Sequence, residues 1–319
     1  MNYFNSFIKE SFRLFSEQPT FIPDLDIAFA IDKNYLKPCG ITLFSIAKNN
    51  QDLKINFHIF TTYFDSFGYD EIISQFKNTQ IFVYILNTEP YDKLQVNGHF
   101  TTAIYYRLSI ANIFKDKLDK FIYLDADILC VSSLKQICSI NIENKVLAAV
   151  QDKCMKPTYI ESIGLNPNDK YFNSGVLLIN TKEWNNFDVL TKFNTLISKR
   201  DYKFPDQDVL NILLKNKMIF IDQKFNYFTR DDISPALIHF VSSPKPWSIA
   251  ASHGELYLKY YYQSPWKDQP LDAPKNSKEA KKFAKILWRK GKYLASIQWY
   301  ILYICLLYTS PSPRDQRGS

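Results

Sequence analysis

Apolar residues along the chain follow two alternating patterns. Short, nearly continuous apolar runs, which are typical of buried strands, cover residues 26–31, 55–60, 81–86, 121–124, 146–150, 175–179, 219–221 and 236–241. Apolar residues at helical spacing predict helices over 38–49, 70–77, 101–114 and 205–214, the last with Pro205 in its first turn. Because strands that alternate with helices form parallel sheets covered by helices, the pattern predicts an α/β fold with a mostly parallel sheet.

The pattern changes near residue 275, where basic residues dominate. Residues 275–292 hold eight Lys and Arg residues against Glu279 alone, and eight minus one equals the formal net charge of +7 for the whole chain. Six basic residues recur at three- and four-residue steps and share one face of a predicted helix: Lys278, Lys281, Lys282, Lys285, Arg289 and Lys292. Another face carries apolar residues: Ala280, Phe283, Leu287 and Leu294.

Residues 293–304, after this face, are aromatic and apolar, but they number only about half of the ~20 residues that a bilayer-spanning helix needs. We therefore expect 269–304 to be a basic amphipathic helical segment whose part 275–304 lies on an anionic membrane surface. The alternative is a helix packed on the preceding domain with a solvated charged face. Because the rest of the chain is balanced in charge, nucleic acid is not an expected partner.

Both ends of the chain stand apart from the predicted domain at 24–268. Residues 1–23 form a polar and aromatic extension without the apolar core of a signal peptide. Residues 309–319 are rich in turn formers, and together with residues 305–308 they are typical of a non-native or disordered tail at 305–319. The five cysteines show no C-x-x-C spacing and are expected to be reduced thiols. Together these features favour a cytoplasmic protein.

Two aspartates, Asp125 and Asp127, follow the apolar run at 121–124. Carboxylates at the end of a buried strand are costly to bury without a counter-charge, and a divalent cation removes that cost. Mg²⁺ and Mn²⁺ prefer oxygen ligands and usually bind substrate phosphates as well. With only eight glycines and no glycine-rich phosphate loop, the chain is expected to bind a diphosphate through a metal. The alternative is an ordinary Asp-rich turn.

Six segments occur in order within 24–268: 29–35 (FAIDKNY), 105–108 (YYRL), 123–127 (YLDAD), 171–176 (YFNSGV), 205–211 (PDQDVLN), and 238–240 (IHF) followed by KPW at 245–247. Together they resemble glycosyltransferase family 8, which includes bacterial lipopolysaccharide galactosyl- and glucosyltransferases and, more distantly, glycogenin. The segment 264–268 (SPWKD) and the basic helix after it are similar to the lipopolysaccharide-core branch in particular.

The resemblance implies a GT-A fold, a UDP-galactose or UDP-glucose donor, a divalent metal and retention of anomeric configuration. It assigns the metal to Asp125, Asp127 and His239, and a histidine among the ligands favours Mn²⁺ over Mg²⁺. Without the resemblance, His239 between Ile238 and Phe240 is more typical of a core histidine. The expected acceptor is a lipid-linked glycan, such as the lipopolysaccharide core, at the cytoplasmic face of the inner membrane.

The same resemblance assigns donor and acceptor contacts. Four residues are assigned to the nucleotide and its diphosphate: Ala30, Asp32, Asn34 and Lys245. Five residues are assigned to the donor sugar: Arg107, Asn173, Ser174, Asp206 and Gln207. Asp152 is assigned to acceptor hydroxyls.

Several of these residues have a structural alternative. Asp32 and Asn34 suit an Asx turn, and Lys245 suits a solvated loop. Arg107 suits an apolar helix face from which its head reaches water, and the carboxylate of Asp206 suits the first turn of a helix. The residues at 173–174 are expected in a turn where small side chains let a sugar approach.

Gln207 is expected to face the anomeric carbon of the donor. Retention by double displacement needs a carboxylate nucleophile, and an amide is a poor nucleophile. We therefore favour front-face attack, in which the departing phosphate takes the acceptor proton while the metal and Lys245 stabilise the diphosphate. Asp206, and less readily Asp152, is the alternative nucleophile.

Other functions compete with this one. A glycogenin-like protein would glucosylate itself and gain hexose mass with the donor alone. Phosphatases with an apolar strand that ends in D-x-D-x-T/V also bind Mg²⁺, but Leu129 stands here in the place of Thr or Val. A sugar- or nucleotide-binding module without activity is disfavoured because all three predicted metal ligands are present.

Overall fold

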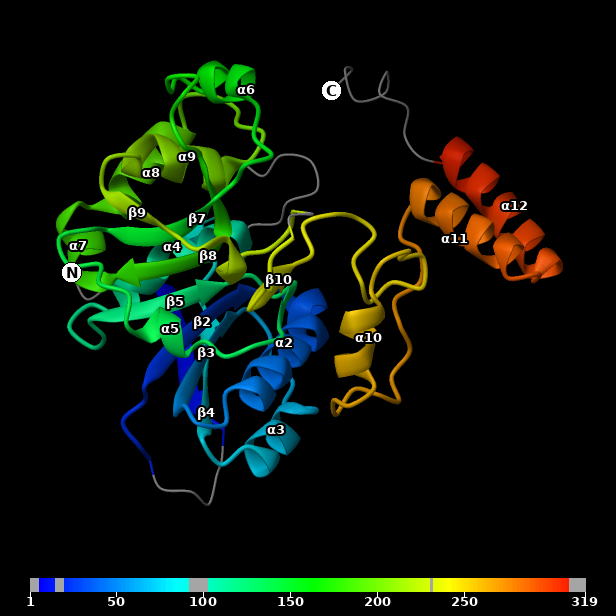
Figure 1. Ribbon diagram of the computed structural model, residues 1–319, viewed down its shortest axis with the longest axis horizontal. Helices are drawn as coiled ribbons and strands as arrows, with labels where there is room; N and C mark the ends of the chain where they lie inside the picture. Colours follow the sequence, from blue (N-terminus) through cyan, green and yellow to red (C-terminus); the bar gives the residue numbers. More distant parts are fainter. Residues whose placement is uncertain (1–5, 15–19, 92–102, 230–231, 310–319) are drawn as a thin grey trace. The chain divides into compact units, whose positions relative to one another are not determined.

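The computed structural model describes residues 6–14, 20–91, 103–229 and 232–309. The chain divides into two compact units, Met1–His239 and Phe240–Ser319. Figure 1 shows a mixed sheet with its helices in the first unit and a helical second unit.

An eight-stranded sheet forms the centre of the first unit, in the order β1-β4-β3-β2-β5-β8-β7-β9. Its strands are β1 (Ile8–Arg13), β2 (Leu25–Ile31), β3 (Ile55–Thr61), β4 (Thr79–Leu86), β5 (Lys120–Leu124), β7 (Leu147–Gln151), β8 (Phe172–Asn180) and β9 (Met218–Ile221). Only β1 and β8 run against the others, so six of the eight strands point the same way. This confirms the predicted mostly parallel sheet.

Helices cover both faces of the sheet, with α2 and α3 in front of it and α4 behind it in Figure 1. The helices of this unit are α2 (Leu36–Asn49), α3 (Tyr69–Gln75), α4 (Ala103–Ile113), α5 (Lys135–Cys138), α6 (Pro157–Ser162), α7 (Thr181–Asn186), α8 (Val189–Ile197) and α9 (Pro205–Leu214). Beneath α4, an apolar core joins the helix to the sheet and includes Ala28, Leu108, Phe121 and Tyr123. This packing gives the strand ends beside α4 a rigid support.

The carboxyl ends of the parallel neighbours β2 and β5 meet at one edge of the sheet. Beyond β5, a two-stranded ribbon forms from β6 (Ile128–Cys130) and β10 (Leu237–His239), with His239 opposite Ile128. The ribbon therefore brings residue 239 beside the turn that carries residues 125 and 127.

Strand β1 lies within the extension at 1–23, for which the sequence predicted no element; it pairs with β4, Ile8 opposite Leu86, and the open sheet edge supplies its hydrogen bonds. One prediction for this unit was wrong. Strand β8 begins at Phe172, so residues 173–174 lie inside a strand that pairs with β7 rather than in a turn. The first two residues of the helix predicted over 101–114 lie outside the described residues.

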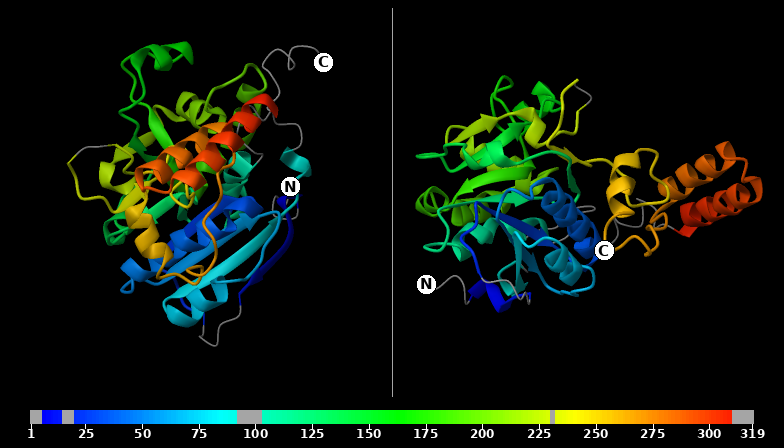
Figure 2. Two further views of the ribbon diagram at one scale, coloured as in Figure 1. Left: turned by 90° about the vertical axis from the view of Figure 1, so that its right-hand side faces the viewer. Right: turned by 60° about the horizontal axis from the view of Figure 1, so that its bottom comes forward.

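The second unit contains α10 (Glu255–Tyr261), α11 (Ser277–Arg289) and α12 (Tyr293–Thr309). Asn276 caps α11 by accepting a hydrogen bond from the Glu279 N–H. Gly291, at φ +74°, occupies the left-handed region that ends many helices. After it the chain reverses, so α11 and α12 lie side by side (Figure 2).

The prediction that Leu294 shares one helix face with Ala280 and Leu287 was therefore wrong. Leu294 belongs to α12 and is 81% exposed. The first residues of the predicted tail continue α12 up to Thr309, and residues 310–319 lie outside the described ranges. Among the described residues, no helix combines the length and apolarity needed to cross a bilayer.

Candidate active site

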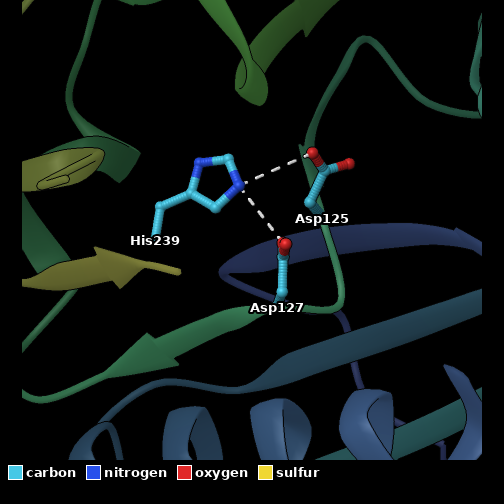
Figure 3. Close-up of side chains that lie close together, drawn as sticks. All are labelled: Asp125, Asp127 and His239. Atoms are coloured by element: carbon cyan, nitrogen blue, oxygen red, sulfur yellow. Dashed lines mark ion pairs between the residues drawn. The ribbon is translucent and has the colours of Figure 1, made fainter. Parts of the chain in front are cut away.

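Asp125 and Asp127 lie in the turn between β5 and β6, and His239 ends β10 (Figure 3). The Nε2 atom of His239 lies 3.2 Å from Asp127 Oδ1 and 3.8 Å from Asp125 Oδ2. One potential ligand atom from each residue lies within 4.8 Å of the other two. The structure thus brings together the three residues predicted to bind a metal.

This donor set suits a divalent cation. Burial raises the pKa of Asp125; Arg107 opposes that shift and the neighbouring carboxylate of Asp127 adds to it. A cation held by both carboxylates and the imidazole removes their mutual repulsion, and these ligand types suit Mn²⁺. Gly175 leaves the room that the ring needs, since a Cβ there would lie 2.3 Å from Cε1 of His239. His239 is therefore a constrained member of the cluster.

Arg107, on α4, links the cluster of Asp125, Asp127 and His239 to the start of α9. Its guanidinium lies 2.9 Å from Asp125 Oδ1 and 3.1 Å from Asp206 Oδ2, and it donates to the Ser174 carbonyl at 3.0 Å. It stacks over the Tyr123 ring at 4.5 Å and is only 7% exposed. Burial disfavours its charge, but the carboxylates outweigh this and raise the pKa of Arg107. The alternative of an arginine that reaches out to water was wrong.

Gln207, in the first turn of α9, is held on both sides of its amide. Its Oε1 accepts hydrogen bonds from the Ser174 N–H and from Asn173 Nδ2, each at 3.0 Å. Its Nε2 donates to the Tyr171 hydroxyl at 3.2 Å, and that hydroxyl donates to Asp208 at 2.5 Å. The Gln207 side chain is therefore held in one orientation.

The two carboxylates that flank Gln207 have different partners. Asp206 pairs with Arg107 and accepts from the Ser174 hydroxyl at 2.9 Å. Asp208 is fully buried and accepts from the hydroxyls of Tyr159 and Tyr171. Burial raises the pKa of Asp208 although both tyrosines stabilise its charge. Both side chains are thus engaged in tertiary contacts, beyond the stabilisation of a helix dipole that was the alternative for Asp206.

The predicted nucleotide and acceptor residues of the first unit lie at carboxyl ends of parallel strands. Ala30 is near the end of β2, and Asp32 follows it and accepts the Asn34 N–H at 2.8 Å in an Asx turn. Asp152 follows β7 and accepts the Cys154 N–H at 3.0 Å, and burial raises the pKa of Asp152. All these residues share the sheet edge at which open α/β sheets bind ligands.

Lys245 lies in the second unit, where its Nζ donates to the Phe240 carbonyl at 2.7 Å. Its assignment to the diphosphate stays a prediction from the sequence.

Three residues of the site were not given a role by sequence reasoning: Tyr123, Tyr171 and Asn226. The Tyr123 hydroxyl donates to Asp125 Oδ1 at 2.8 Å, and Asn226 Oδ1 lies 2.9 Å from Nδ1 of His239. Tyr123 matches the apolar pattern of a buried strand, and Asn226 follows a short 3₁₀ turn in an irregular segment. Neither Tyr123 nor Asn226 carries a spacing signal that separates it from ordinary core or loop residues.

Comparisons with known proteins show the family and the fold of this chain. The model of glycosyl transferase family 8 matches residues 26–251, and the model of the glycosyl transferase family 8 C-terminal region matches residues 253–306. Lipopolysaccharide glucosyltransferase WaaO of Escherichia coli is 34% identical over 305 residues, which cover 88% of this chain and 90% of that protein. Lipopolysaccharide 1,3-galactosyltransferase of Salmonella typhimurium is 32% identical over 302 residues, which cover 87% and 90%.

The fold has a solved counterpart in the galactosyltransferase LgtC, whose crystal structure contains donor and acceptor sugar analogues. The TM-score is 0.66 at 24% identity, with 75% of this chain and 96% of that chain covered. This likeness confirms the GT-A fold. Because one family model alone matches more than half of the chain, and two relatives exceed 30% identity over most of it, this protein belongs to glycosyl transferase family 8.

Proposed function

We propose that this protein is a metal-dependent, retaining hexosyltransferase that moves galactose or glucose from a UDP-sugar to a lipopolysaccharide core or a similar lipid-linked glycan. The observation that carries the proposal is the cluster of Asp125, Asp127 and His239, joined through Arg107 to Asp206. The acceptor class is supported by the activities of the lipopolysaccharide glucosyl- and galactosyltransferases to which the chain is similar.

The three predicted metal ligands and the residues at the end of β2 would together bind the UDP-sugar donor. Asp125, Asp127 and His239 would hold Mn²⁺ or Mg²⁺, which when bound neutralises the diphosphate and stabilises the leaving group. The nucleotide and its diphosphate are assigned to Ala30, Asp32, Asn34 and, from the sequence, Lys245. The donor sugar is assigned to Arg107, Asn173, Ser174, Asp206 and Gln207, and the acceptor to Asp152.

The contacts of these side chains support front-face attack. The Gln207 oxygen already accepts two hydrogen bonds, and the charge of Asp206 is paired with Arg107. Both arrangements reduce nucleophilicity at the groups closest to the assigned sugar site. In the proposed step the acceptor oxygen bonds to the anomeric carbon on the face from which UDP departs. The bond from that carbon to the phosphate oxygen breaks, and the acceptor proton passes to the departing phosphate.

The α11–α12 pair supports a peripheral position on the cytoplasmic face of the inner membrane. Five apolar residues of α12 recur at three- and four-residue steps, and each is between 49% and 87% exposed: Leu294, Ile297, Ile301, Ile304 and Tyr308. Exposed basic residues of α11 accompany them: Lys278, Lys282, Lys285 and Arg289. An anionic surface would attract each basic residue by up to ~1 kcal/mol, while the apolar row enters the interface.

Release of UDP from a panel of UDP-hexoses tests the proposed donor and metal. We expect UDP to be released from UDP-galactose or UDP-glucose in the presence of Mn²⁺, and no UDP to be released in EDTA. After EDTA treatment, Mn²⁺ should restore the release of UDP at least as well as Mg²⁺. Transfer to a truncated lipopolysaccharide then tests the acceptor. No release from any UDP-hexose in Mn²⁺ would contradict the proposal, and a gain of hexose mass by the protein with the donor alone would favour self-glucosylation.

A further inference from the structure

A row of side-chain amides connects Gln207 with the ring of His239. Asn173 Nδ2 lies 3.0 Å from Gln207 Oε1, Asn226 Nδ2 lies 2.8 Å from Asn173 Oδ1, and Asn226 Oδ1 lies 2.9 Å from His239 Nδ1. Asn226 is fully buried and the other three side chains are less than 9% exposed. Asn226 therefore makes the contact to the ring nitrogen that faces away from the two aspartates.

Two backbone N–H groups determine which end of each amide is oxygen. The Gly175 N–H lies 3.0 Å from Asn173 Oδ1, and the Ser174 N–H lies 3.0 Å from Gln207 Oε1. A backbone N–H can only donate, so both contacted atoms must be carbonyl oxygens. The Asn173 oxygen then requires a donor from Asn226, which places the Asn226 oxygen against the imidazole. The orientation of all three amides follows from the strand backbone of β8.

The consequence for His239 is a defined tautomer. Its Nδ1 faces an acceptor and must carry a proton, so its Nε2 can offer a lone pair toward Asp125 and Asp127. The ring has little freedom to turn, because Gly175 lies directly against Cε1 and the Phe228 ring meets the imidazole edge-on at a centroid distance of 6.2 Å.

We infer that Asn226 is a positioning residue for the metal centre. It presents Nε2 of His239 as a ligand, and through Asn173 it joins the orientation of that ligand to the orientation of Gln207. This inference rests on the proposed function, because it takes the three-residue cluster as a metal site. Groups that orient a ligating histidine typically change metal affinity about 10- to 100-fold when they are lost.

The test compares Mn²⁺ binding by the full-length protein and three variants, measured by calorimetry or by electron paramagnetic resonance of free Mn²⁺. Asn226→Ala should weaken binding about 10- to 100-fold. Asn226→Asp keeps an acceptor for the Nδ1–H and should bind Mn²⁺ more tightly than Asn226→Ala. Asn50→Ala is the matched control: Asn50 is also fully buried and bonded, to the Ile46 carbonyl and the Leu134 N–H, and its loss should leave Mn²⁺ affinity within about twofold.

A second readout does not need Mn²⁺. The chain has only four histidines, so long-range ¹H–¹⁵N correlation spectra, assigned with His239→Gln, can show which nitrogen of His239 carries a proton. We expect a proton on Nδ1 in the wild type, and its absence would overturn the inference. An Asn226→Ala variant that binds Mn²⁺ as tightly as the wild type would overturn the inference as well. Failure of the wild type itself to bind Mn²⁺ or Mg²⁺ would instead count against the proposed function. In that case the spectra alone would decide the tautomer of His239.

Discussion

The candidate active site of the first unit and the α11–α12 pair of the second depart from the usual distribution of side chains in opposite ways. In the site, charged and polar groups such as Arg107, Asp206 and Asp208 are buried, and each is held by directional bonds. On α12, large apolar groups such as Leu294 and Ile301 are exposed. Burial of charge is tolerated only with partners, and an exposed apolar row marks an interaction surface.

The two regions should therefore respond differently to substitution. Substitutions in the site alter a network in which every group depends on its neighbours, so small changes should have large effects on binding and transfer. Substitutions on the exposed row break no bond within the described protein, so they should leave folding and donor chemistry intact and alter only docking.

Asp127→Asn should have the largest effect, because it removes one predicted metal ligand. We expect Mn²⁺ affinity and the rate of transfer to fall by more than ~100-fold. Loss of a residue that only orients a metal ligand already lowers metal affinity or activity by up to about 100-fold, and loss of a ligand itself should cost more. The melting temperature should not fall, because repulsion among buried carboxylates decreases. Asp169→Asn, which removes an ion pair with Lys215, is the control and should keep full activity. Normal Mn²⁺ binding by Asp127→Asn would show that the cluster is not the metal site.

Gln207→Ala should slow transfer by about 100-fold, the usual cost of losing one positioned polar group at a reacting centre. Measurable activity should remain, because front-face attack needs no covalent bond to the protein. Intact mass spectrometry of the wild type with donor should show no sugar adduct. A trapped adduct on Asp206 or Asp152 would instead establish double displacement.

Gly175→Ala should have a smaller effect on Mn²⁺ binding, because it displaces the imidazole ring of His239. The new Cβ would lie 2.3 Å from Cε1 of His239, so the imidazole must move. We expect a loss of about 1–3 kcal/mol in the free energy of unfolding, together with Mn²⁺ affinity reduced about tenfold. Urea denaturation and Mn²⁺ titration measure the two effects. Unchanged Mn²⁺ affinity would mean that the ring is not constrained as the structure indicates.

Combined substitution of Leu294 and Ile301 by serine should have the smallest effect on donor chemistry. The rate of UDP-sugar hydrolysis should stay within about twofold of the wild type. Binding to anionic vesicles, measured by cosedimentation, should weaken about tenfold, because burial of each apolar side chain in the membrane interface contributes part of a hydrophobic free energy of ~1.5–3 kcal/mol. Ile22→Ser changes a residue that is 89% exposed in the first unit and serves as the control. Vesicle binding equal to that of the wild type would remove α12 from the docking surface.

Much of the fold could be predicted because local patterns agree with it. The apolar run before Asp125 is β5, and Pro205 begins α9 as its position in the pattern indicates. Strand β1 could not be predicted, because its burial is confined mainly to Ile8 and its pairing depends on the open edge of β4. The break between α11 and α12 depends on one residue, Gly291, whose left-handed conformation is visible only in the folded backbone.

The residue types of the site, most of the strands and helices that carry them, and the resemblance to the family follow from the sequence alone. The bridge that Arg107 forms between Asp125 and Asp206, the room that Gly175 leaves for His239 and the contact of Asn226 with its ring appear only in the folded protein. These contacts join segments far apart in the chain, such as Asn173 and Asn226, which are 53 residues apart. The direction of a hydrogen bond is set by the partners that folding brings together, and no periodic pattern in a single segment records it.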